Sequence, residues 1–179
     1  MNIGILTGGG DCPGLNAVIR AVVRKAEKYY GTTVFGFHDG WKGILDERYE
    51  ELTIERMRGT LPRGGTILGT TRDHPYMFEG GTDTVKRVCT KLDIDSVIVI
   101  GGEGTLSCAL ELQNDGVVNV IGVPKTIDND IKISFSNGAD AIFIPSTEDI
   151  YPPNNKNITV SYTHLRAHET SLHIVCRLL

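Results

Sequence analysis

The chain has 179 residues, of which 40% are hydrophobic and 22% are charged, and its net charge is −4. This length supports one good-sized hydrophobic core and is too short for two ordinary domains. The negative charge argues against nucleic acid or an anionic membrane as the main partner, and no apolar run approaches the length of a membrane span. The cysteines lack CxxC or zinc-ligand spacing, so we expect free thiols in a reducing cytoplasm: Cys12, Cys89, Cys108 and Cys176.

Strand and helix patterns alternate along the first 130 residues. Apolar runs predict strands, and apolar residues at helical spacing predict helices. In chain order, we expect a strand at 2–6, a helix at 14–30, a strand at 32–37, an irregular segment at 41–65, a helix at 82–92, a strand at 96–100, a helix at 105–113 and a strand at 117–123. This alternation predicts an α/β fold: a doubly wound, mostly parallel sheet with helices on both faces and right-handed crossovers.

Two glycine-rich turns follow predicted strands directly, at residues 8–11 and 101–105. Glycine lets the backbone approach an oxyanion, and the next helix supplies unpaired N–H donors, so both turns are candidate phosphate sites. The first turn has neither Walker A nor GxGxxG spacing, and a tight turn without a ligand explains it equally well. In the second turn, Glu103 beside phosphates would require a cation, which implies Mg²⁺. Taken alone, this turn favours the alternative that Glu103 and Thr105 only cap the following helix.

Further polar residues follow the last predicted strand. Thr126, Asp128 and Asp130 lie just after the apolar run 117–123, where open α/β sheets hold their ligands. A carboxylate beside Mg²⁺ stays ionised and can act as a general base, although a surface turn rich in Asp and Asn is the alternative. Arg72 could reach a phosphate with its guanidinium, but a lone loop arginine is more often solvated. We expect these loops to converge on one edge of the sheet.

The pattern decays after residue 130. The last twenty residues hold three histidines that could in principle bind a metal, and a tail with no fixed site is the alternative that composition favours: His164, His168 and His173.

Four motifs resemble signatures of the phosphofructokinase family and occur in that family's order: GGDCPGLN at 9–16, GGTILGTTR at 64–72, GGEGT at 101–105 and PKTIDND at 124–130. The resemblance implies that Asp128 is the base that activates the 1-hydroxyl of fructose 6-phosphate, and that Thr126 and Asp130 help to place that sugar and Mg²⁺. It implies that Glu103 is the Mg²⁺ ligand and that the phosphoryl donor is held by Gly10, Arg72, Asp73, Gly102, Glu103, Gly104 and Thr105. The reaction implied is transfer of a γ-phosphoryl group, helped mainly by positioning and charge neutralisation.

Two residues bear on the identity of the donor. In this family a glycine at the position of Gly104 goes with ATP, because an aspartate there would crowd and repel the α-phosphate. Pyrophosphate users carry that aspartate together with a lysine at the position of Lys125. This chain has the glycine of one type and the lysine of the other. We expect ATP, with a pyrophosphate-dependent phosphotransferase and a non-catalytic nucleotide-binding module as the alternatives.

The resemblance covers residues 1 to about 131. We expect 1–131 to be the family's N-terminal nucleotide-binding part, 132–160 to match it only vaguely, and 161–179 to be a non-native tail. The basic residues that grip the sugar phosphate are expected in a second domain, so we expect this fragment to be inactive alone. The resemblance implies a complete glycolytic enzyme that is cytoplasmic and a homo-oligomer, either a dimer or a tetramer, without a nucleic-acid or membrane partner.

Overall fold

The computed structural model describes residues 2–125. Its elements, in chain order, are β1 (Asn2–Thr7), α1 (Leu15–Lys25), the π-helical turn η1 (Ala26–Tyr30), β2 (Thr33–Phe37), α2 (Trp41–Leu45), β3 (Tyr49–Leu52), the 3₁₀ turn η2 (Pro75–Met77), α3 (Gly81–Lys91), β4 (Ile94–Gly101), α4 (Glu103–Asn114) and β5 (Asn119–Pro124). None of the helices within residues 2–125 is long and apolar enough to cross a membrane.

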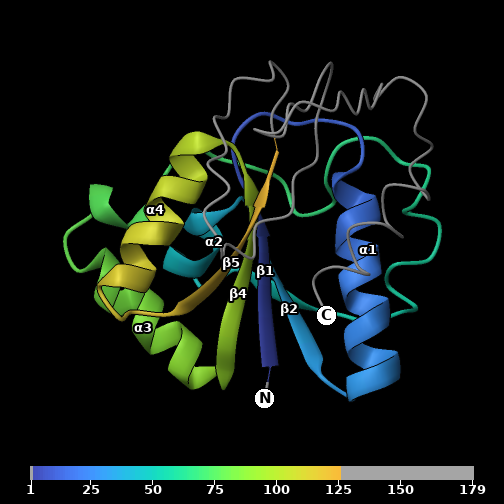
Figure 1. Ribbon diagram of the computed structural model, residues 1–179, viewed down its shortest axis with the longest axis horizontal. Coiled ribbons are helices and arrows are strands. Elements are labelled where there is room, and N and C mark those ends of the chain that lie inside the picture. Colours follow the sequence, from blue (N-terminus) through green and yellow to red (C-terminus); the bar gives the residue numbers. More distant parts are fainter. Residues whose placement is uncertain (1, 126–179) are drawn as a thin grey trace, which may run out of the picture.

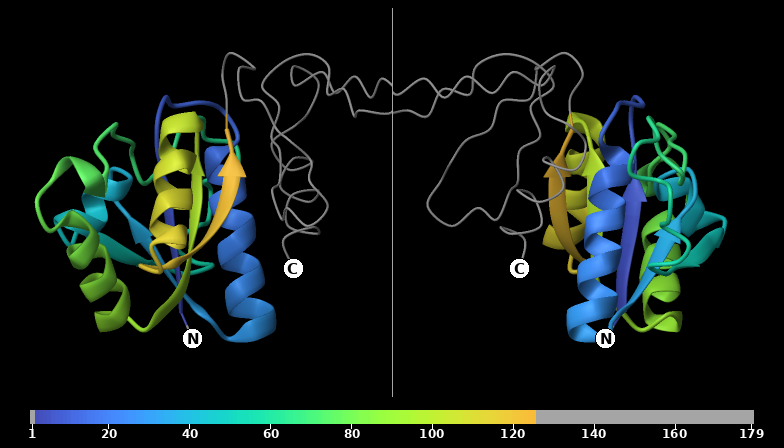
Figure 2. Two further views of the ribbon diagram at one scale, coloured as in Figure 1. Left: turned by 60° about the vertical axis from the view of Figure 1, so that its left-hand side comes forward. Right: turned by 90° about the vertical axis from the view of Figure 1, so that its right-hand side faces the viewer.

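The strands form one sheet in the order β3-β2-β1-β4-β5. β1, β2, β4 and β5 run parallel, and β3 pairs antiparallel with β2 at the edge. The helix after β1 lies on one side of the sheet, whereas α3 and α4 lie on the other (Figures 1 and 2). The chain therefore moves outward from β1 in one direction and from β4 in the other. Such a reversal opens a crevice outside the carboxyl ends of the two central strands, which is where doubly wound sheets bind ligands.

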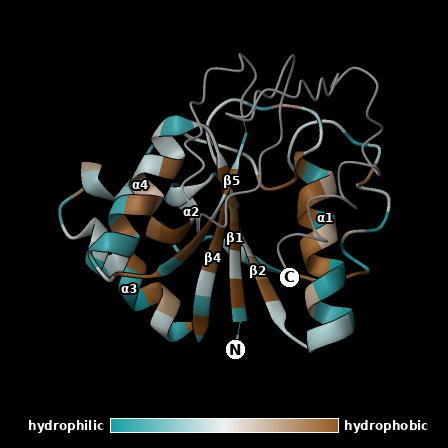
Figure 3. Ribbon diagram, in the orientation of Figure 1, coloured by the Kyte–Doolittle hydropathy of each residue, from teal (hydrophilic) through white to brown (hydrophobic). Residues whose placement is uncertain are grey.

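Each face of the sheet has its own hydrophobic core. Along β4, Ile98 and Ile100 pack on the α1 side, while Val97 and Val99 pack on the side of α3 and α4. Successive strand residues point to opposite faces, so a strand buried on both faces needs a continuous apolar run. Figure 3 shows this band of hydrophobic residues through the central strands. The predicted α/β fold, with a mostly parallel sheet and helices on both faces, is confirmed.

The segment 41–65 differs from the prediction, because it contains α2 and β3 instead of being irregular throughout. The sequence of β3 is Tyr-Glu-Glu-Leu, and of these residues only Leu52 is buried. Glu50 is partly exposed and forms an ion pair with Arg56 at 2.7 Å. A short strand with two glutamates has little apolar pattern, and it is held by pairing with β2 rather than by its own propensity.

Candidate functional site: a pocket at the ends of the central strands

The two predicted glycine turns meet at the carboxyl ends of β1 and β4. The amide of Gly8 donates to the carbonyl of Ile100 at 2.8 Å, which continues the pairing of the two strands into the turns. Gly9 has a φ of +75°, a conformation that residues with a side chain rarely adopt. α4 begins immediately after β4, and its N-cap residue Gly102 makes no side-chain capping bond. Within residues 2–125 no side chain accepts from the first amides of α4, which are thus available as donors at the positive end of the helix dipole.

The capping role considered for Glu103 and Thr105 finds only limited support. In the described part of the chain no side-chain hydrogen bond caps α4, and Glu103 lies in the first turn, where its charge suits the dipole. Thr105 instead fills the space between the strand ends. A Cβ atom on Gly8 or on Gly101 would come within 2.6 Å of the Thr105 side chain. The glycines at these two positions thus allow α4 to approach the sheet closely.

The segment that carries Arg72 is held against the same strand ends. The hydroxyl of Thr7 donates to the carbonyl of Gly69 at 2.8 Å, and the amide of Asp39 donates to the carbonyl of Leu68 at 2.7 Å. The buried side chain of Asn16 adds a third anchor, because its Oδ1 accepts from the amide of Ile67 at 2.8 Å. These bonds join residues far apart in the sequence and bring Arg72 beside the second glycine turn.

A pocket of about 330 Å³ lies where these segments meet. All the predicted donor-binding residues except Gly10 line it: Arg72, Asp73, Gly102, Glu103, Gly104 and Thr105. Four residues that the prediction did not name complete the wall: Gly9, Trp41, Thr71 and His74. Gly9 and Thr71 stand inside the motifs quoted above, so their place could have been inferred. Trp41 and His74 carried no such signal.

The pocket combines one cation, two carboxylates and exposed helix amides. Arg72 and Glu103 are both exposed, and Asp73, which also lines the pocket, is partly buried. Within residues 2–125 no group of three or more His, Cys, Asp or Glu side chains could hold a metal by itself. Mg²⁺ usually binds through one or two carboxylates together with phosphate oxygens and water. Glu103 and Asp73 are the carboxylates that could serve in this way.

Lys125 lies at the other side of the first glycine turn. Its side chain is 4% exposed, and its ammonium donates to the carbonyl of Gly10. An ammonium has three N–H donors, and within residues 2–125 no carboxylate forms an ion pair with it. Burial raises the pKa of the neighbouring Cys12 thiol, and the charge of Lys125 partly opposes this rise. Among the described residues only the carbonyl of Gly10 accepts from this buried ammonium, so it is well suited to an anion at the turn.

The remaining predicted residues lie outside the part of the chain that the structure describes. These are Thr126, Asp128 and Asp130 of the proposed sugar and base site, and the three histidines of the last twenty residues. Their roles stay predictions, as does the division of the chain beyond residue 131.

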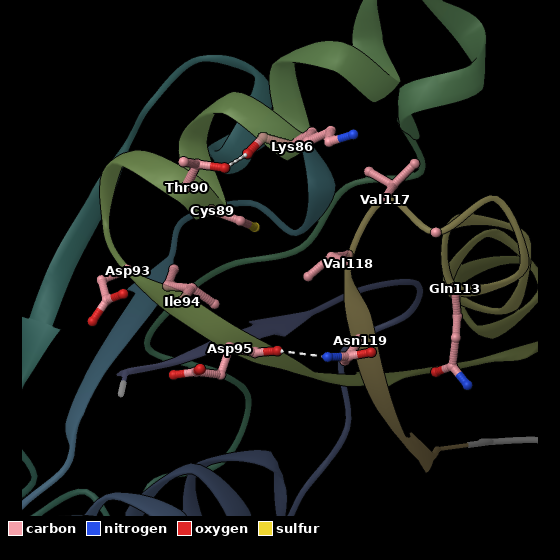
Figure 4. Close-up of a pocket in the computed structure, with 11 residues that line it drawn as sticks. Lys86, Cys89, Thr90, Asp93, Ile94, Asp95, Gln113, Val117, Val118 and Asn119 are labelled. Atoms are coloured by element: carbon pink, nitrogen blue, oxygen red, sulfur yellow. Dashed lines mark hydrogen bonds between the residues drawn. The ribbon is translucent and has the colours of Figure 1, made fainter.

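A second pocket, of about 420 Å³, lies at the opposite ends of β4 and β5. Cys89 and Val118 point into the space between α3 and β5 (Figure 4). Two of its polar side chains are already bonded to the protein: Asn119 donates to the carbonyl of Asp95, and Thr90 to that of Lys86. It contains neither of the glycine turns before a helix, and it lies at the end of the sheet where such folds do not bind their ligands.

Comparison with known proteins agrees with this geometry. A family model described as Phosphofructokinase matches residues 2–150. Among curated relatives, the chain is 45% identical over 168 residues to the pyrophosphate–fructose 6-phosphate 1-phosphotransferase of Amycolatopsis methanolica, which covers 93% of this chain and 48% of the relative. It is 50% identical over 134 residues to ATP-dependent 6-phosphofructokinase 3 of Streptomyces coelicolor, which covers 75% of this chain and 39% of the relative.

Among solved structures, phosphofructokinase from Pichia pastoris in the T-state superposes with a TM-score of 0.66 at 33% identity, over 73% of this chain and 16% of that one. The chain thus spans about half the length of the curated relatives it matches, or less. Since the family model covers most of the sequence, the chain belongs to the phosphofructokinase family, a family of phosphotransferases.

Proposed function

We propose that this chain forms the donor-binding part of an ATP-dependent 6-phosphofructokinase, which transfers the γ-phosphoryl group of Mg·ATP to the 1-hydroxyl of fructose 6-phosphate. The observation that carries the proposal is the pocket at the carboxyl ends of β1 and β4. It gathers Arg72, Glu103 and the first amides of α4, which no side chain within residues 2–125 caps, around one space. A cation, a metal-binding carboxylate and helix amides are the groups that phosphoryl transfer requires.

Each part of the pocket has a distinct task in this reaction. The amides at the start of α4 and the turn at Gly9 would receive phosphate oxygens, which carry negative charge. Arg72 would neutralise charge on the transferred group, because its guanidinium can bind two phosphate oxygens at once. Glu103, helped by Asp73, would hold Mg²⁺, and the ion would screen the charge between donor phosphates. Outside the described residues, Asp128 would accept the proton of the sugar hydroxyl, and Thr126 and Asp130 would place the sugar and Mg²⁺.

The pocket wall supports a nucleotide as the donor. Trp41 and His74 line it together with the phosphate-binding turns. Trp41 is only 2% exposed and belongs to the hydrophobic core, whereas His74 is partly exposed. The ring of His74 could therefore contact the base of a nucleotide, and pyrophosphate has no apolar part to do so. The Cβ of a residue at position 104 would meet no atom within 4 Å, so the lack of a side chain there leaves space beside the helix amides. An aspartate in that space would place a negative charge beside the donor phosphates.

One observation favours pyrophosphate as an alternative donor. The buried ammonium of Lys125 lies beside the first glycine turn, and within residues 2–125 it donates only to Gly10, as a site for a compact, highly charged anion would require. The relatives include both donor types by name. Excluding ATP would need an acidic side chain near position 104, and Gly104 lacks one.

The experiment that tests the proposal is a calorimetric titration of the chain with Mg·ATP and with Mg·pyrophosphate. Gly104→Asp and Lys125→Met are the informative variants. Gly64→Asp is the matched control, because a side chain there also meets no atom within 4 Å and Gly64 does not line the pocket. We expect saturable Mg·ATP binding that Gly104→Asp abolishes and Gly64→Asp retains.

Other outcomes would lead to other conclusions. Binding of pyrophosphate alone, lost in Lys125→Met and kept in Gly104→Asp, would replace ATP by pyrophosphate. Binding of neither donor by a chain that melts cooperatively would refute the proposed donor site.

A further inference from the structure

Thr7 is the last residue of β1, and its side chain is completely buried. Its Oγ1 lies 2.8 Å from the carbonyl oxygen of Gly69 and 2.9 Å from Oγ1 of Thr66. The hydroxyl of Thr66 also accepts from the amide of Leu68 at 3.1 Å. Two hydroxyls therefore join the end of β1 to the segment that leads to Arg72.

The direction of each bond in this group follows from the number of donors. A hydroxyl has one proton to donate. The carbonyl of Gly69 can only accept, so Thr7 donates to it and must accept from Thr66. The order is Leu68 amide to Thr66 hydroxyl, to Thr7 hydroxyl, to Gly69 carbonyl. Every member is satisfied, and Thr7 is the member that belongs to the sheet.

The position of Arg72 depends on this backbone anchor. Within residues 2–125 its guanidinium forms no ion pair, so no described side chain fixes it. The anchors from Asp39 to Leu68 and from Asn16 to Ile67 hold the segment before Gly69. Nearer to Arg72, the amide of Gly9 donates to the carbonyl of Thr71 at 3.4 Å, which is long for this type of bond. Among these short anchors, the bond from Thr7 to Gly69, at 2.8 Å, is the one nearest to Arg72 along the chain.

We propose that Thr7 is a positioning residue for the phosphoryl donor, because its hydroxyl fixes the segment 66–73 so that Arg72 faces the pocket. This inference rests on the proposed function of that pocket. Thr7 touches neither the donor nor the reacting atoms in this account, and it acts only through the placement of Arg72. Removal of the Thr7 hydroxyl should therefore weaken donor binding, while the chain still folds.

The test compares three variants. Thr7→Val has nearly the same shape but lacks the hydroxyl, and Thr7→Ser keeps the hydroxyl. Thr60→Val is the matched control, because Thr60 is 2% exposed and its hydroxyl donates only within its own turn, to the carbonyl of Met57 at 2.8 Å. Each variant is titrated with Mg·ATP and with Mg·pyrophosphate, its thermal melt is recorded, and amide hydrogen exchange is followed over residues 66–73.

We expect Thr7→Val to raise the Kd of the bound donor about tenfold, since a buried carbonyl loses its partner. Exchange at residues 69–73 should become faster in this variant. Thr7→Ser and Thr60→Val should stay within about twofold of the unaltered chain in donor Kd.

Three results would overturn the inference. If Thr7→Val binds the donor as the unaltered chain does, the positioning role is wrong, while the proposed function stands. Equal weakening in Thr7→Val and Thr60→Val would show a general loss of stability instead. If the unaltered chain binds neither donor, the proposed function fails and the donor role of Thr7 fails with it.

Discussion

The contact between Gly8 and Thr105 provides a direct test of how α4 is placed against the sheet. A Cβ on Gly8 would lie 2.6 Å from both Oγ1 and Cγ2 of Thr105 and 3.2 Å from its Cβ. A separation of 2.6 Å is too short for any normal contact, whereas 3.2 Å is tight, so Gly8→Ala must displace the threonine or the helix. Overpacking of this kind typically costs about 1–3 kcal/mol of stability. We expect Gly8→Ala to lower the free energy of unfolding by that amount.

A double-mutant cycle separates this clash from other effects. Thr105→Ala removes Oγ1 and Cγ2, so the nearest remaining Thr105 atom is the one 3.2 Å from the added Cβ. We expect Thr105→Ala alone to cost about 1 kcal/mol through lost burial. The double variant Gly8→Ala/Thr105→Ala should be more stable than additivity predicts by about 1–2 kcal/mol.

The assay is urea unfolding followed by far-UV circular dichroism, with the slope against denaturant compared between variants. Gly104→Ala is the control, because its Cβ would meet no atom within 4 Å and it lies in the first turn of α4. Alanine there should be neutral or stabilising by up to about 1 kcal/mol. Additivity of the two changes within about 0.5 kcal/mol would refute the packing argument.

Three further predictions concern buried and charged groups elsewhere. Asn16→Ala should lower the free energy of unfolding, measured in urea, by about 2–3 kcal/mol, because the carbonyls of Arg63 and Gly64 and the amide of Ile67 lose their buried partner. The control is Asn119→Ala, which removes an exposed side chain that donates one hydrogen bond. An equal effect of both variants would contradict this prediction. Hydrogen bonds from Lys91 and Arg87 lower the pKa of Glu47 from 4.5 to about 2, so the contribution of this carboxylate to stability should be present above pH 4.5 and lost as the pH falls toward 2. The urea midpoint should therefore fall less over that window in Glu47→Gln, and an unchanged pH dependence would rule this out. Burial raises the pKa of Cys89 to about 11, so iodoacetamide at pH 8 should label this thiol only after the chain unfolds. Mass spectrometry of peptides measures the labelling. Rapid labelling of the folded chain would contradict the prediction, because it would show that the thiol is accessible.

Local patterns in the sequence were sufficient to predict most strands of the sheet. Buried strands such as β4 consist of continuous apolar residues, and α1 has apolar residues at helical spacing, so both are visible within a short window. β3 was missed because its two glutamates break the apolar pattern and because pairing with β2 holds it. Such an edge strand depends on a partner that no local window contains.

The residues of the candidate site also fall into two groups, those that short sequence patterns predict and those that only the tertiary structure brings to the pocket. The glycine turns and Glu103 were predictable, because each lies directly before or within the first turn of a helix that follows a strand. Trp41 and His74 were not predictable, since their segments come to the pocket only when the sheet has formed. The same holds for Lys125, which could be named as a residue that bears on the donor, although its burial against Gly10 could not be foreseen.

The sequence by itself determined the alternation of strands and helices, the family and the chemical type of the site. These depend on spacing along the chain and on residue types in short motifs. Only the tertiary structure decided which segments meet. The bonds from Thr7 to Gly69 and from Asn16 to Ile67 join residues that are far apart in sequence, so their partners are chosen by strand order and crossover rather than by local propensity. The position of Arg72 over the pocket is a consequence of that arrangement.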